Sequence, residues 1–167
     1  MNQVTQDQVY LALAKVRDPE IPMLSVLDLG IIRKVEIASS IVSIKVTPTY
    51  SGCPALKLIE DSIVETLRLE GLPNVKIERA FSPAWSSDWI SAEGRKKLKE
   101  FGIAPPLPCS ENNDLLVLIK PKAPQNVPCP FCDSLETNLQ SNFGSTACKA
   151  LYYCKICKQP FEYFKTH

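Results

Sequence analysis

Two Cys-x-x-Cys pairs constrain the C-terminal part of this 167-residue chain more than any other feature of its sequence. They are Cys129 with Cys132, and Cys154 with Cys157. Two residues between the cysteines allow both sulfur atoms of a pair to reach one tetrahedral ion at about 2.3 Å. The segment between the pairs, residues 133–153, is slightly longer than usual and only lengthens the hairpin that joins them. The sequence therefore predicts a zinc ribbon in which these four thiolates are the metal ligands.

A bound metal would also explain how so short a part of the chain can fold. Residues 125–167 amount to roughly forty residues, too few to bury a sufficient apolar core unaided. Structural zinc can add about 10–16 kcal/mol of apparent folding free energy. Residues 151–153 and 161–164, which are rich in aromatic side chains, would supply the strands. Four thiolates also suit iron, so an iron or redox centre is the alternative, and a closed shell of four cysteines leaves no open position for catalysis in either case.

The cysteine count and the N-terminal residues indicate a cytoplasmic protein. Seven cysteines, an odd number, in a chain with no export signal argue against a disulfide framework. Residues 1–7 have no positive cluster and no apolar stretch behind them, so we expect no signal peptide. The longest apolar run, Leu115 to Ile119, is far too short to span a bilayer. We therefore expect no membrane partner.

The charge balance argues against nucleic acid as a partner. The net charge is +1, which gives no global field to attract phosphate. Residues 125–167 hold four lysines against three acidic residues and no arginine, although phosphate contacts dominate nucleic-acid affinity. We expect a ribbon that contacts protein, and a nucleic-acid-binding ribbon is the alternative.

The first part of the chain has the pattern of a small α+β domain. Thr5-Gln6-Asp7-Gln8 matches a capping box, and the helix behind it should stop before Pro19. Apolar residues at helical spacing predict a second helix, which opens at Cys53-Pro54 and ends at Gly71. Alternating β-branched residues predict a hairpin and a third strand, and a short basic helix follows. These further elements are expected at residues 31–37, 41–47, 75–80 and 91–101.

A proline-rich stretch separates this domain from the ribbon. Ala104-Pro105-Pro106-Leu107-Pro108 predicts a linker, which continues through the polar residues 110–114. A lone strand at residues 115–119 follows, and we assign it to the ribbon side. The predicted division is an α+β domain at residues 1–104, a linker with a connecting strand at 105–124, and the zinc ribbon at 125–167.

Cys53 is the best candidate for chemistry in the first domain. It follows Gly52, which lets another group approach closely, and it lies where a helix is predicted to begin. The partial positive charge of a helix N-terminus favours a thiolate over a thiol. Catalytic thiols usually rely on a base such as histidine, and the one histidine of the chain is His167. Ligation of iron or an iron–sulfur cluster therefore fits better than nucleophilic catalysis, and a merely buried thiol is the alternative.

Acidic residues near the start of the chain are candidate oxygen ligands for the same metal. They are Asp18, Glu20 and Asp28, and the alternative role for each is helix termination or loop hydrogen bonding. Cys148 lies outside both pairs and is expected to be a buried small apolar residue, with a transient metal ligand as the alternative. Trp85 and Trp89 are expected in the core, and an exposed partner surface is the alternative.

Several segments together resemble the SufT type of iron–sulfur assembly and targeting domain. They are Asp18-Pro19-Glu20-Ile21-Pro22, residues 25–30, and Thr47-Pro48-Thr49-Tyr50-Ser51-Gly52-Cys53-Pro54. Pro83-Ala84-Trp85, residues 91–106, and the fused ribbon with residues 143–150 narrow the match. Over essentially the whole chain, this combination resembles the PaaD family (PaaJ in some operons), accessory subunits of the bacterial phenylacetyl-CoA epoxidase system.

The resemblance implies a role that the residues alone do not define. It implies an iron–sulfur-assembly domain that helps to assemble or maintain an iron–sulfur or diiron centre of a multicomponent oxygenase. The implied partners are the oxygenase, which has a diiron component, and its reductase, which carries a [2Fe–2S] cluster and flavin. Carried over to this chain, Cys53 matches the family's reactive cysteine, and Asp18 and Glu20 match its acidic loop.

Three hypotheses about function follow. In the first, the chain is a non-enzymatic assembly factor that handles iron or a cluster through Cys53 while the ribbon binds a client. In the second, it is a non-catalytic scaffold subunit that bridges oxygenase components and contains only structural metal. In the third, it is a nucleic-acid-binding ribbon protein.

Overall fold

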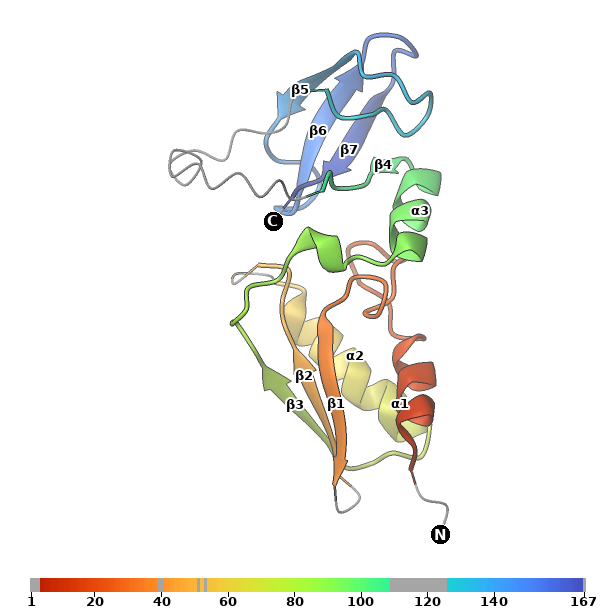
Figure 1. The fold of residues 1–167 in the computed structure, drawn as a ribbon, viewed down its shortest axis with the longest axis vertical. Coiled ribbons are helices and arrows are strands. Elements are labelled where there is room, and N and C mark those ends of the chain that lie inside the picture. Colours follow the sequence, from red (N-terminus) through yellow and green to blue (C-terminus); the bar gives the residue numbers. More distant parts are fainter. Residues whose placement is uncertain (1–3, 39–40, 51, 53, 109–125, 167) are drawn as a thin grey trace. The chain divides into compact units, whose positions relative to one another are not determined.

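The computed structural model describes residues 4–38, 41–50, 52, 54–108 and 126–166. The chain forms two compact units, residues 1–94 and 95–167, which are described separately (Figure 1). The first unit is mixed α/β and the second is β-rich, so the predicted fold class is confirmed. The predicted strand at 115–119 lies outside the described residues. The predicted limits at residues 104 and 124 stay a prediction.

The sheet of the first unit is built around a parallel crossover. Its order is β1-β2-β3, with β1 (Ile32–Ala38) antiparallel to β2 (Ile41–Val46) and β2 parallel to β3 (Val75–Arg79). A parallel pair requires a crossover connection, and α2 (Leu56–Leu69) supplies it. The helix buries the predicted stripe at Leu56, Ile59, Ile63 and Leu67.

The first helix begins as predicted and ends early. α1 (Gln6–Leu13) has the capping box: the Thr5 hydroxyl accepts from the Gln8 backbone N–H, and the Gln8 side chain accepts from that of Thr5. The helix ends at Leu13, because the following backbone pairs with a returning segment instead. The carbonyl of Val16 accepts from the Val26 N–H at 3.0 Å.

In the described residues, no helix is long and apolar enough to cross a bilayer.

A close backbone approach fixes the end of the first unit. The Trp85 indole is buried and donates from Nε1 to the Leu29 carbonyl at 2.9 Å, as expected of a core tryptophan. Trp89 ends the short 3-10 helix η1 (Ser87–Trp89) and is half-buried, with the Arg33 guanidinium 3.6 Å from its ring centroid. Gly30 has φ +65°, and a Cβ there would lie 2.3 Å from the Trp89 carbonyl oxygen. Only glycine fits this position.

The second unit is a four-stranded ribbon sheet with the order β4-β7-β6-β5. β6 is antiparallel to both β5 and β7, whereas β4 is parallel to β7. The basic helix α3 (Ala92–Glu100), predicted at 91–101, precedes β4. The strands are β4 (Ile103–Ala104), β5 (Thr137–Ser141), β6 (Lys149–Cys154) and β7 (Pro160–Phe164).

Three aromatic rings pack together in the ribbon core. Tyr152 stacks on Phe161 with 5.8 Å between ring centroids and meets Tyr163 edge-on at 5.6 Å. All three rings are buried, together with the side chains of Cys129 and Cys154. The two Cys-x-x-Cys segments, residues 129–132 and 154–157, therefore share a core with the sheet.

An ion pair with a buried lysine holds the loop between β5 and β6. Lys149 is buried, and its Nζ lies 2.9 Å from Oε2 of Glu162. The other carboxylate oxygen of Glu162 accepts from the Ser145 backbone N–H at 2.6 Å. Burial acts to raise the pKa of Glu162, but the Ser145 amide and the Lys149 ammonium outweigh it and hold the pKa below its usual range.

We expect substitution of Gly30 to destabilise the first unit strongly. Gly30→Ala places a Cβ against the Trp89 carbonyl and forces alanine to a positive φ, which should cost about 3 kcal/mol or more in the free energy of unfolding. Gly71→Ala is the matched control, since Gly71 has φ +82° with nothing within 4 Å, and should cost about 1 kcal/mol. Urea unfolding of the two variants measures the difference. Equal losses would show that the clash does not matter.

Candidate metal centre

The same tight turn occurs twice in the ribbon, once at each cysteine pair. In the first turn the Cys129 carbonyl accepts from the Asp133 N–H at 2.9 Å, and the Cys129 N–H donates to the Ser134 carbonyl at 3.0 Å. In the second turn Cys154 makes the same two bonds, with Lys158 at 3.1 Å and Gln159 at 3.0 Å.

The residue after each pair closes its turn with a left-handed backbone. Asp133 has φ 57° and Lys158 has φ 60°. Aspartate tolerates this conformation better than most residues, and lysine has no such preference. The repeated conformation therefore follows from the turn geometry that two cysteines on one site require.

The two turns bring the four predicted sulfur atoms to one point. All four Sγ atoms lie within 4.8 Å of one another. Two of these separations join the two turns, from Cys129 to Cys157 and from Cys132 to Cys154, and each is 3.6 Å. A tetrahedral shell with metal–sulfur bonds of about 2.3 Å has sulfur atoms about 3.8 Å apart. The arrangement therefore fits one tetrahedral metal ion of zinc size.

The four thiols differ in their surroundings. Cys129 and Cys154 are buried, Cys157 is intermediate and Cys132 is exposed. Burial raises the pKa of the Cys129 thiol to about 12 and also raises that of Cys157. Burial acts in the same direction on Cys154, but the backbone N–H groups of Cys157 and Ile156 outweigh it and lower the pKa to about 6. Amides aimed at sulfur thus favour a thiolate at this position.

The arrangement suits a structural metal more than a reactive one. Four sulfur ligands fill a tetrahedral shell, so no position remains for water or substrate. Cys148 is buried and is not a member of the four-sulfur group; its Sγ lies 3.1 Å from the Thr146 hydroxyl. It matches the predicted buried small residue.

The structure places the acidic residues of the first unit in a hydrogen-bonded loop. Asp18 is buried, and its Oδ1 accepts from the backbone N–H groups of Glu20 and Ile21, each at 2.8 Å. Asp28 is also buried, and its Oδ2 accepts from both the N–H and the hydroxyl of Ser25 at 2.9 Å. Glu20 is partly buried. Asp18 and Asp28 therefore stabilise the loop through hydrogen bonds, whatever else they bind.

Cys53 lies outside the described residues. Within the described part of the chain, the four ribbon cysteines form the one group of three or more cysteine, histidine or acidic residues close enough to share an ion. The roles of Cys53, Asp18 and Glu20 toward iron stay predictions.

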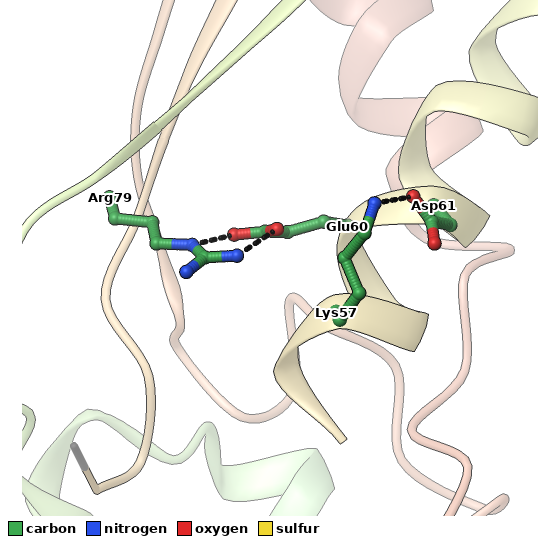
Figure 2. A network of polar contacts seen from close by, with 4 residues as sticks. All are labelled: Lys57, Glu60, Asp61 and Arg79. Carbon is green, nitrogen blue, oxygen red and sulfur yellow. Dashed lines mark hydrogen bonds and ion pairs between the residues drawn. The ribbon is translucent and has the colours of Figure 1, made fainter. Parts of the chain in front are cut away.

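One buried carboxylate in the first unit was not predicted from the sequence. Glu60 on α2 is buried and accepts two bonds from Arg79 on β3, at 2.5 Å from Nε and 2.7 Å from Nη2 (Figure 2). The hydrogen bond to Glu60 raises the pKa of Arg79. Lys57 and Asp61 pair beside it on the same helix. A glutamate between the buried positions 59 and 63 was the signal that could have indicated it.

Comparison with known families agrees with the two units. Residues 6–79 match the model of the iron–sulfur cluster assembly protein family, and residues 118–165 match that of the PaaD zinc beta ribbon domain. The fold and the four-cysteine centre therefore define an iron–sulfur-assembly-type domain joined to a zinc ribbon. Across 158 residues, the chain is 42% identical to a protein of Escherichia coli (strain K12) that is provisionally named as a subunit of 1,2-phenylacetyl-CoA epoxidase. This match covers 95% of the chain and 91% of the relative, and the chain belongs to the PaaD family.

Other relatives match little more than half of the chain. An Fe-S protein maturation auxiliary factor of Porphyromonas gingivalis (strain ATCC BAA-308 / W83) is 36% identical over 96 residues, which are 56% of this chain and 90% of that protein. A conserved hypothetical protein from Thermotoga maritima has a similar fold, with a TM-score of 0.51, 31% identity, and coverage of 59% of this chain and 97% of its own. A domain of unknown function from Bacillus anthracis, at a TM-score of 0.53 and 23% identity, covers 56% of this chain and 90% of its own, and supports the fold only.

Removal of metal should unfold the ribbon and leave the first unit folded. We expect a strong chelator, or the substitution Cys154→Ser, to abolish metal binding and make residues 126–166 sensitive to protease, because the turns and the sheet share one core. Metal analysis and mass spectrometry of a limited digest measure both effects. Cys148→Ser is the matched control and should keep the metal and the protection. A ribbon that resists protease without metal would contradict the expectation.

Proposed function

We propose that this protein is an accessory protein of phenylacetyl-CoA epoxidation that assembles or maintains an iron–sulfur or diiron centre of the oxygenase. The observation that carries the proposal is the 42% identity, over 95% of the chain, to a protein named as an epoxidase subunit. A relative that covers 56% of the chain is named as an Fe-S protein maturation auxiliary factor, and residues 6–79 match the iron–sulfur cluster assembly protein family, which supports the same role for the first unit. A small accessory role, rather than catalysis of epoxidation itself, is consistent with a saturated metal shell.

The proposal assigns a structural zinc ion to the ribbon. Cys129, Cys132, Cys154 and Cys157 are its ligands, as the sulfur geometry and the ribbon family support. Zinc has no redox chemistry, so the ion would contribute folding free energy and keep the two turns in place. The chain's own contribution is to aim backbone amides at the sulfur atoms, which stabilises thiolate over thiol.

The proposal assigns iron or a cluster, as cargo, to the first unit. Cys53 would be the soft thiolate donor, and Asp18 and Glu20 would be oxygen donors from the acidic loop. An ordered loop supports this assignment, because Asp18 fixes the backbone of residues 20 and 21 through two hydrogen bonds. A transient site benefits from donors that do not close the coordination shell, since the cargo must leave.

The proposal assigns client binding to the ribbon. Phe131 and Ile156 occupy the same position in the two turns, directly before the second cysteine of each pair, and both are at least half exposed. Leu135 is 56% exposed and lies between Ser134 and Glu136, whose carbonyls accept from Cys129 and Lys155 respectively. Three large apolar side chains at the metal end of a small domain are typical of a protein-contact surface. The occupant would be an oxygenase or reductase component.

The same apolar residues favour a second candidate, a scaffold subunit that bridges oxygenase components and handles no iron. The two candidates differ in the importance of Cys53. They agree on the ribbon.

Cys53→Ser separates the two candidates. Under the assembly proposal, the variant should keep its zinc and its fold but lose labile iron after anaerobic purification, and cells that carry it should lose ring epoxidation because the thiolate donor is missing. Iron, zinc and sulfide counting beside an activity assay measure this. Cys148→Ser, which removes a thiol outside the ribbon's two cysteine pairs, is the control and should behave as the wild type. Full epoxidation with Cys53→Ser would leave only the scaffold role.

Loss of apolar surface at the ribbon turns should weaken binding of a client. The double substitution Leu135→Ser and Ile156→Ser removes two exposed side chains and should lower affinity for an epoxidase component by about tenfold or more. Titration of purified components, with zinc content as a check of folding, measures the change. Leu69→Ser, at a side chain 82% exposed in the first unit, is the matched control. Unchanged affinity in the double variant would remove the ribbon as the contact surface.

A further inference from the structure

We propose that Cys132 is a peroxide-sensitive site and that its oxidation to a disulfide with Cys154 opens the metal shell of the ribbon. The inference rests on the zinc assignment above and goes beyond it, since a purely structural ion need not respond to oxidants. Three observations carry it: the exposure of one ligand, the distance between sulfur atoms, and the dependence of the core on the site.

The four ligands are not equally accessible. Cys132 is exposed, Cys157 is intermediate, and Cys129 and Cys154 are buried among the aromatic residues of the core. A metal-bound sulfur is held as a thiolate, which is the form that peroxides oxidise. Oxidation of cysteine follows thiolate character together with exposure. Cys132 is therefore the ligand that a small oxidant reaches first.

A resolving sulfur lies close to Cys132 on the other turn. The Sγ atoms of Cys132 and Cys154 are 3.6 Å apart, and the other short pair, Cys129 and Cys157, contains no exposed residue. A disulfide bond of about 2.05 Å needs these two atoms to move together by roughly 1.5 Å. Since the pair joins the two turns, the disulfide would form across the site rather than within one Cys-x-x-Cys pair.

The reaction balances with hydrogen peroxide as the oxidant. The Cys132 thiolate attacks one peroxide oxygen, the O–O bond breaks, and the sulfur becomes a sulfenic acid while hydroxide leaves and takes up a proton as water. The Cys154 thiolate then attacks the Cys132 sulfur, the S–OH bond breaks, and a second water leaves after protonation. Two thiolates lose two electrons in all, and one peroxide is reduced to two waters. Two of the four ligands are thereby removed from the ion.

Loss of the ion would be transmitted to the whole ribbon. Cys129 and Cys154 pack in the same buried cluster as Tyr152 and Phe161, so the site and the sheet share a core. The apolar residues Phe131 and Ile156 lie within the two turns that the ligands hold. Oxidation would therefore disperse the proposed client surface while leaving the first unit intact.

The test uses the full-length protein after its zinc content has been measured. Stepwise addition of hydrogen peroxide, with a chromogenic chelator present, should release one zinc ion per disulfide formed. Differential alkylation and mass spectrometry should find the first disulfide between Cys132 and Cys154. A reductant with added zinc should restore both the thiols and the ion.

Matched variants identify the sensitive sulfur. Cys132→His keeps four ligands, because histidine also binds zinc, and should slow peroxide-driven zinc release by about tenfold or more since the exposed thiolate is gone. Cys157→His changes the other turn in the same way, keeps the Cys132 and Cys154 pair, and should retain most of the wild-type sensitivity. Cys148→Ser should release zinc at the wild-type rate.

The outcomes separate this inference from the zinc assignment. Absence of zinc from the purified protein would remove both. Zinc that stays bound at a large excess of peroxide, with Cys132 unmodified, would overturn only the inference. A first disulfide within one Cys-x-x-Cys pair, or equal sensitivity of the two histidine variants, would also overturn it.

Discussion

Mutual repulsion among four sulfur atoms is the constraint on which the ribbon depends. Thiolates within 4.8 Å of one another in a partly buried position are unfavourable unless a cation lies between them. Two turns with the same hydrogen-bond pattern, each closed by a residue at positive φ, bring these sulfur atoms together. The sheet behind these turns is small, and two of the cysteines belong to its core. The proposed zinc ion would therefore stabilise the turns and the strands, and would hold the exposed apolar residues of the turns in place.

The first unit is held together by an apolar core. A conventional apolar interface forms between α2 and a three-stranded sheet, and the Glu60–Arg79 pair ties the helix to the last strand. This difference suits the proposed division of labour, since a unit that exchanges cargo must remain folded with and without it. The unit that contacts a client can instead be conditional on its ion.

Features fixed by neighbouring residues could be predicted from the sequence. The capping box at Thr5, the buried stripe of α2 and the convergence of the two cysteine pairs all depend on spacing within a few residues or on one shared ion. Contacts between remote segments could not be predicted. The early end of α1 depends on Val26, which pairs with the backbone of Val16. Position 30 requires glycine because of the Trp89 carbonyl, and Lys149 can be buried because it pairs with Glu162. None of these partners is marked by local composition.

The short strand β4 has a consequence for how the ribbon can be isolated. Ile103 and Ala104 pair with β7 and so cover one edge of the ribbon sheet, and Tyr163 of β7 accepts a hydrogen bond from the Leu107 N–H that follows. A fragment that starts at residue 118, where the ribbon family match begins, would lack this strand. Its β7 would present unpaired backbone groups at a sheet edge, which invites intermolecular strand pairing. The self-sufficient ribbon is thus longer than its sequence signature.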